Sequence, residues 1–233
     1  MSWNISMILI DKKLDEDAKI EFVRKYYKSY IKGSNTSLEL SLNPKNNSIY
    51  IGNYGNSTII THFEIPLHIN WEVKDIGKFE KKHNKTSKLC KTFDDCNIFC
   101  VYLNSVGTVF NYSFFKNGER IRHKRNQIKG NFDLCEEVGS LLMAEQEYYS
   151  FSKIKHIEKG REVNYGKKIG ILHKTYYCSR EYYSLKRINN EEESLSEFQC
   201  AYEVIMNTTK QFLNRRLDEM ELENILMIEY CKK

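Results

Sequence analysis

The chain has 233 residues and a net charge of +5, and 41% of its residues are hydrophobic while 29% are charged. This is an ordinary globular composition, and a chain of this length buries roughly 70–75% of the surface that its unfolded form exposes, so it needs neither metals nor disulfides to fold. Only eleven glycines and two prolines are present, which argues against disorder and against a long flexible linker.

The cysteines and the first residues indicate the compartment. Seven cysteines at irregular spacings do not form a disulfide framework, so we expect buried thiols. The first ten residues lack the basic segment and the cleavage site of a signal peptide. No apolar run approaches the ~20 residues of a membrane span. We therefore expect a cytoplasmic protein that makes no membrane contact.

The first elements of the chain are a predicted strand and a predicted helix. Residues 3–10 are rich in apolar side chains and short enough for a buried strand. Three acidic residues at 15–17 suit the positive end of a helix, and apolar residues recur at helical spacing over 22–31. Gly33 is placed to end this helix as a left-handed cap.

The period then changes from helical to alternating. Strands are predicted at residues 48–52, 57–65, 97–103 and 108–115. Pro66 ends the second of these strands or places it at a sheet edge. Asn117-Gly118 follows the last one and predicts a tight hairpin. The lysine-rich stretch 74–91 has no clear period and indicates an exposed loop, whereas 133–149 is compatible with a loop or a helix.

The last part of the chain is predicted to be helical. Ser194 and Glu197 have the spacing of a capping box, and an apolar stripe follows them. A second helical run is expected over 218–230. The sequence thus predicts an α+β fold with a mainly antiparallel sheet, an N-terminal helix and a C-terminal helical pair. We expect a core domain over 1–150, with 151–233 packing on it or joining it in one single domain.

Several of these segments resemble a known group of proteins. The segments are the strand 101–106, the strand 110–115, the hairpin 117–122, the turn 135–139 and the later Glu145. Their order is similar to that of a family of uncharacterised bacterial proteins, known only as a domain of unknown function. The resemblance covers about residues 1–150 and implies a fold and a bacterial cytoplasmic setting. That family has no established activity, so the resemblance implies no catalytic residue.

Two charged residues fall on the charged positions of that family pattern. Arg122 lies on the return strand of the hairpin, and Glu145 follows the glycine turn. They could form a structural ion pair, or both could be ordinary surface charges. If they pair in the interior, the removal of one partner would cost several kcal/mol. The adjacent acids Glu136 and Glu137 are expected in a cap or turn rather than as an acid–base pair.

Two clusters have residue types that bind metals. Cys90, Cys96 and Cys100 follow His83, but only the second cysteine interval matches the short spacing of structural zinc sites. His62, Glu64 and His68 would share one face of a regular strand, although Pro66 interrupts it. Buried thiols and exposed or hydrogen-bonded histidines are the preferred interpretation of the two clusters. With no recognisable nucleophile or phosphate-binding motif either, we expect no cofactor and lean towards a non-enzymatic protein.

A basic, tyrosine-rich segment covers residues 153–187, with ten Lys/Arg against three Glu. Its residues that could bind a partner are Lys167, Lys168, Tyr176, Tyr177 and Arg180. Tyrosine and arginine are enriched at protein interfaces, while cations and aromatic rings together also suit single-stranded nucleic acid. The alternative is a pair of strands with charged outer faces, neutralised by the acidic residues of 188–233.

The function expected from the sequence is that of a non-enzymatic, cytoplasmic bacterial protein that binds another protein. Proteins that neutralise toxins in bacterial competition are an example of this class. A nucleic-acid-binding module that uses the segment 153–187 is the alternative. The sequence leaves the identity of the partner and the oligomeric state open.

Overall fold

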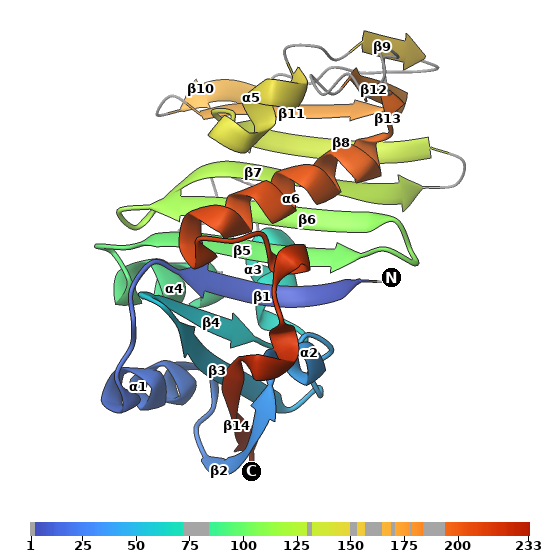
Figure 1. The fold of residues 1–233 in the computed structure, drawn as a ribbon. Coiled ribbons are helices and arrows are strands. Elements are labelled where there is room, and N and C mark those ends of the chain that lie inside the picture. The colour runs from blue at the N-terminus through green and yellow to red at the C-terminus, as the bar shows by residue number, and fades with distance from the viewer. Residues whose placement is uncertain are drawn as a thin grey trace.

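The computed structural model describes residues 3–71, 84–129, 132–149, 153–156, 165–168, 171–177, 179–183 and 194–233. The strands of the large sheet are β1 (Asn4–Ile10), β2 (Tyr30–Ser37), β3 (Ser48–Tyr54), β4 (Ser57–Thr61), β5 (Asn97–Asn104), β6 (Val109–Lys116), β7 (Glu119–Lys129), β8 (Phe132–Gly139), β10 (Tyr165–Lys168), β11 (Ile171–Tyr177) and β14 (Leu226–Lys232). Their order in space is β10-β11-β8-β7-β6-β5-β1-β4-β3-β14-β2 (Figure 1).

Each pair of neighbouring strands in this sheet is antiparallel, so the predicted α+β fold with a mainly antiparallel sheet is confirmed. A small second sheet joins β9 (Lys153–His156), β12 (Ser179–Tyr183) and β13 (Ser194–Leu195). The large sheet takes strands from both sides of residue 150. Its last strand, β14, lies between β3 and β2, which belong to the first quarter of the chain.

The large sheet is covered on both faces, and β1 shows why. Ile5, Met7 and Leu9 point into one core cluster, whereas Ile8 and Ile10 point into the other. A strand that is buried on both sides is apolar throughout instead of alternating with polar residues. This explains why the short apolar run at residues 3–10 predicts its position correctly.

Helices form the outer layers (Figure 1). On one face, three helices contribute to the core cluster that contains Met7: the long helix α6 (Glu197–Leu213), α2 (Leu38–Ser41) and α5 (Met143–Tyr149). On the other face, three further helices contribute to the cluster that contains Ile8: α1 (Glu16–Tyr26), α3 (Ile65–Trp71) and α4 (Asn84–Thr92). In the described residues no helix is long and apolar enough to cross a membrane.

Helix α1 begins as predicted and ends earlier. The side chain of Asp15 accepts a hydrogen bond from the backbone N–H of Ala18, which makes it the N-cap. The expected end at Gly33 is wrong, because the helix stops at Tyr26 and the chain enters β2. Pairing with β14 places Gly33 in a strand, so tertiary hydrogen bonds outweigh the local helical pattern.

Other predicted boundaries shift in the middle of the chain. The strand expected over 57–65 ends at Thr61, and α3 begins at Ile65. The loop expected over 74–91 is partly wrong, since residues from Asn84 onwards form α4, while 72–83 lie outside the described residues. The hairpin is confirmed: β6 and β7 pair around Asn117 and Gly118, both with positive φ (51° and 74°).

The C-terminal helical pair is half right. Helix α6 is present, but its capping box uses Ser196 and Gln199 instead of Ser194 and Glu197. The second helix expected over 218–230 is wrong. That stretch forms two short 3₁₀ turns, η2 (Leu217–Glu219) and η3 (Leu222–Asn224), followed by β14. Strands β2 and β3 hydrogen-bond β14 from both sides, and this ladder replaces the helix.

The capping box of α6 makes a testable prediction. The Ser196 hydroxyl accepts from the N–H of Gln199, and the Gln199 side chain accepts from the N–H of Ser196. We expect Ser196→Ala to lower the free energy of unfolding by about 1 kcal/mol, because one helix N–H loses its partner. Urea unfolding would measure this, with Ser196→Asp as the control that keeps an acceptor. Equal losses in both variants would contradict the cap.

Candidate functional site

The predicted residues Arg122 and Glu145 lie in direct contact. Arg122 Nε is 3.0 and 2.9 Å from the two carboxylate oxygens of Glu145, and Arg122 Nη2 is 2.7 Å from Oε1. Arg122 is 2% exposed and Glu145 is fully buried. The pair is therefore a bidentate interaction in the interior rather than two surface charges, and such pairs are the strong class of charged hydrogen bonds.

Further groups complete this site. Arg122 Nη2 donates to Glu137 at 2.8 Å, and Nη1 donates to the carbonyl of Gly139 at 3.2 Å. The hydroxyl of Tyr112 donates to Glu145 at 2.7 Å. The pattern of adjacent acids led us to expect Glu137 in a cap or turn. It lies instead on β8, opposite Lys124 in the ladder, and its side chain accepts the hydrogen bond from Arg122, which is opposite Gly139.

Glu145 has a second role at the start of α5. Its Oε2 accepts a hydrogen bond from the backbone N–H of Leu142 at 2.7 Å, the reach-back contact of a capping box. The turn before it contains Gly139, whose φ is +87° and whose position leaves no room for a Cβ, since one would lie 2.0 Å from the Ile121 carbonyl oxygen. The carboxylate of Glu145 thus joins α5 and this turn to β6 and β7.

A second buried ion pair lies on the same strand. Lys124, two residues along β7 from Arg122, is 2.5 Å from Glu197, and both side chains are buried. Glu197 occupies the first turn of α6, where a carboxylate also interacts favourably with the helix N-terminus. Sequence reasoning missed this pair because the partners are more than seventy residues apart. The only signal was the alternation of basic residues along β7.

The other face of β7 is polar as well. His123 Nδ1 is 2.9 Å from the hydroxyl of Ser113, and both residues are fully buried. Arg120 donates to the carbonyl of Ile69 in α3 at 2.6 Å, and its guanidinium lies 5.0 Å from the ring centre of Phe115. The hydroxyl of Ser113 is out of reach of a substrate, so this serine–histidine contact joins strands rather than forming a nucleophile.

The predicted histidine cluster does not converge. His62 Nδ1 accepts from the N–H groups of Glu64 and Ile65, which caps α3, so the proton of the neutral ring sits on Nε2, 2.8 Å from the Tyr27 hydroxyl. Burial raises the pKa of Tyr27 to about 12, so this hydroxyl stays protonated. Glu64, just before α3, and His68 in α3 are exposed, and their side chains lie 3.9 Å apart.

The cysteines behave as thiols. Cys96 donates to Asp95 at 3.1 Å, and burial raises its pKa to about 12. Cys100 donates to the carbonyl of Pro66 at 3.6 Å. Cys90 is half-buried on α4, and His83 lies outside the described residues. Within the part of the chain that the structure describes, no three His, Cys, Asp or Glu residues gather in a way that could hold a metal ion.

A buried carboxylate lies beside β2. Glu229 on β14 accepts hydrogen bonds from Ser48 (2.8 Å), Tyr50 (2.9 Å) and Lys45 (3.3 Å). Desolvation raises the pKa of Glu229, but these three donors outweigh it, and the net effect is a lowered pKa. A Cβ on Gly33 would lie 3.2 Å from Glu229, so the glycine lets β2 approach this carboxylate.

The predicted partner-binding residues lie at the opposite end of the sheet. Lys167 and Lys168 belong to β10, which is an edge strand of the large sheet. Tyr176 and Tyr177 belong to β11, the strand next to it, and Arg180 belongs to β12 of the small sheet. The structure therefore brings the first four into two adjacent strands and places Arg180 in another sheet.

Comparisons with known proteins give no further guidance. No family model, no curated protein and no solved structure matches the chain. The site is thus defined by its own geometry: β7 carries buried charges on both faces, and those on the α6 face are neutralised by acids from β8, α5 and α6.

Removal of Glu145 tests the buried pair. We expect Glu145→Ala to lower the free energy of unfolding by about 3–5 kcal/mol, because Arg122 would remain buried with a lost partner and α5 would lose its cap. Chemical denaturation would measure this. Lys12→Ala is the matched control: Lys12 and Asp95 form an ion pair at the surface, so its loss should have little effect. Similar losses in both variants would contradict the buried site.

The pH dependence of stability tests Glu229. Because its pKa is lowered in the folded state, the ionised carboxylate stabilises the fold above its unfolded pKa, and this contribution is lost as the pH falls through the folded pKa. We expect Glu229→Gln to be less stable than the wild type at pH 7, with the difference shrinking towards pH 3. Urea unfolding across this range checks it. A constant difference at all pH values would contradict the assignment.

Proposed function

We propose that this chain is a non-enzymatic cytoplasmic protein that binds another protein, as toxin-neutralising proteins of bacterial competition do. The observation that supports it best is the position of Lys167 and Lys168 on the edge strand β10, beside the tyrosines of β11. Edge strands have backbone donors and acceptors on their outer side, and recognition by strand addition uses them.

The chemistry of the segment 153–187 defines the partner. Ten Lys/Arg against three Glu favour an acidic surface or an acidic extended segment. Tyrosines supply large, stiff contact area that keeps a polar tip, which is why they are enriched at interfaces. An extended acidic segment would thus add to β10 through its backbone and contact the lysines through its carboxylates.

The burial of the polar groups supports a non-enzymatic role. Arg122 with Glu145, and Ser113 with His123, are the described groups that most resemble catalytic residues, and all four are buried. Charged interior groups with complete partners hold elements together rather than meeting a substrate. The function is then expected at the surface, and β10 has no strand neighbour on its outer side among the residues that the structure describes.

Capture experiments test this proposal. We expect the full chain to capture a protein from the lysate of its native host and to bind the same protein after purification. Lys167→Glu combined with Lys168→Glu should weaken this binding at least tenfold, whereas Lys116→Glu, an exposed charge on β6, should not. Absence of any stable partner would contradict the proposal.

The alternative ligand is single-stranded nucleic acid, which cations and aromatic rings of the same segment would suit. Labelled oligonucleotides in a salt series distinguish it. Tight binding that falls steeply with salt, and that the Lys167→Glu/Lys168→Glu variant loses, would replace the protein partner. Absence of binding leaves the protein partner as the explanation for a successful capture.

A further inference from the structure

The other edge of the large sheet is β2, and its outer side has no strand neighbour among the described residues. Five consecutive residues of this eight-residue strand, 31–35, are exposed to solvent. On the inner side β2 pairs with β14 along its whole length, apart from a bulge between Ile228 and Tyr230. An edge of this length presents a row of backbone donors and acceptors to solvent.

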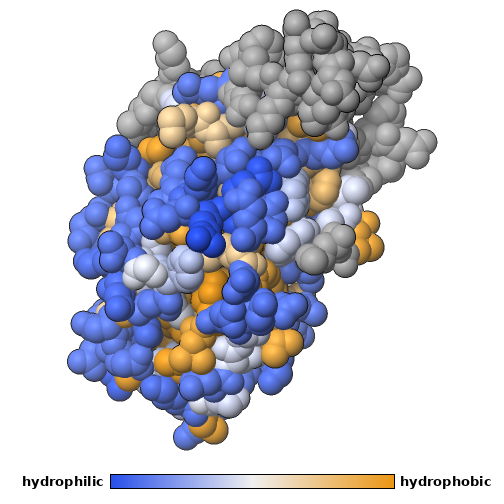
Figure 2. Space-filling model, viewed as in Figure 1, coloured by the Kyte–Doolittle hydropathy of each residue, from blue (hydrophilic) through white to orange (hydrophobic). Residues whose placement is uncertain are grey.

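Exposed apolar side chains lie near both ends of this edge. Ile31 on β2 is 55% exposed, Leu40 in α2 is 71% exposed and Leu226 at the start of β14 is 59% exposed. Leu226 pairs with Ser37 at the end of β2, and Leu40 follows three residues later. Single exposed apolar residues are ordinary, but three around one open strand suit a contact surface. Figure 2 shows small hydrophobic areas among hydrophilic ones over this lower part of the molecule.

The two ends of β2 differ in charge. At its start, exposed lysines come from three segments that meet there. The N–H of Lys233 donates to the carbonyl of Ser29, and Lys232 pairs with Tyr30. The lysines of this end are Lys28, Lys32, Lys45, Lys232 and Lys233. Lys32 and Lys45 also pair with Glu16 and Glu229, while the other three form no ion pair with a described residue.

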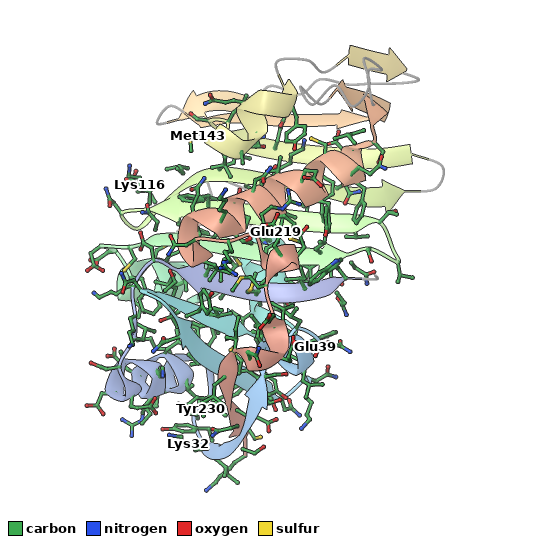
Figure 3. The ribbon with its side chains drawn as sticks, viewed as in Figure 1. Lys32, Glu39, Lys116, Met143, Glu219 and Tyr230 are labelled. Carbon is green, nitrogen blue, oxygen red and sulfur yellow. The ribbon has the colours of Figure 1, made fainter. Side chains whose placement is uncertain are left out.

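The far end of β2 is acidic. Helix α2 continues directly from β2, and the N–H of Leu38 donates to the carbonyl of Ile225, just after η3. This contact brings three exposed acids together: Glu39, Glu221 and Glu223. Figure 3 shows Lys32 and Glu39 towards opposite ends of the strand. The two ends of this edge therefore carry opposite charges, with cations at the start of β2 and carboxylates at its end.

We propose that two copies of this chain associate through their β2 edges, antiparallel about a two-fold axis. A two-fold contact uses the same surface on both copies, so the surface has to complement itself. Antiparallel pairing places the basic end of one β2 against the acidic end of the other, twice. It also brings Ile31 of each copy towards Leu40 and Leu226 of the other, and the two large sheets become continuous.

The features that protect this edge from unspecific pairing are consistent with a selective contact. Lysine on an edge strand and a bulge in its ladder both disfavour indiscriminate strand addition. A partner has to match the charges in order to approach, and the second copy does so by symmetry. This association goes beyond the proposed function and uses the edge opposite to β10, so both surfaces are available at once.

A charge exchange tests the contact. One variant carries Lys28→Glu and Lys232→Glu, and the other carries Glu39→Lys and Glu223→Lys. We expect the wild type to sediment as a dimer and each variant alone to dimerise roughly tenfold more weakly or worse, because like charges then oppose each other in both symmetry-related contacts. An equimolar mixture should dimerise again, since each basic end meets an acidic end in the mixed pair. Native mass spectrometry identifies the mixed dimer.

Lys116→Glu, on β6 and away from β2 in Figure 3, is the control and should leave the sedimentation unchanged. Circular dichroism and thermal unfolding of each variant establish that it is folded. A wild type that remains monomeric up to millimolar concentration would overturn the proposal, and so would a dimer that both exchanges leave intact or a mixture that stays monomeric. A protein captured through Lys167 and Lys168 would be unaffected by these outcomes.

Discussion

The burial of the Arg122 guanidinium is the constraint on which the arrangement of the elements around β7 depends. An arginine cannot release its proton, so a buried one has to be matched by carboxylates and carbonyls in fixed positions. Here the partners come from β8, from the turn at Gly139 and from α5, while the Tyr112 hydroxyl donates a further hydrogen bond to the carboxylate of Glu145. Each of these elements is therefore held in register with β7 by a group that cannot be left unpaired.

This constraint also explains the unusual strand β7. Residues 122–126 are consecutive, polar and buried, so the strand is enclosed on both of its faces. Strand β1 is also buried on both faces, and its side chains there are apolar. In β7 the buried side chains are instead charged or hydrogen-bonded, and the ion pair of Lys124 with Glu197 joins α6 to the strand. The apolar strand supplies hydrophobic burial, and the polar strand specifies which helix lies where.

Sequence reasoning succeeded where the signal was local. The run at 3–10, the acid cap at Asp15 and the Asn117-Gly118 turn each depend on a few adjacent residues, and the structure has all three. It failed where distant segments decide. The stretch 226–232 has apolar residues that fit either a helix or a strand, and only its position between β2 and β3 makes it a strand. For the ion pair of Lys124 with Glu197, the alternation of basic residues along β7 gives no indication of the partner, which lies more than seventy residues away.

The same long-range pairing governs the surfaces from which function is expected. Strand β14 comes from the end of the described chain, yet it is the inner neighbour of β2, and its Lys232 belongs to the basic end of that edge. The acids at the other end are in part from η3, which precedes β14 directly. Because β14 runs antiparallel to β2, the two segments place charges of the same sign at the same ends: Lys232 lies beside the start of β2, and the acids of η3 come just before the contact with Leu38 at its end. The full charge contrast of this edge therefore exists only once the last strand is in place.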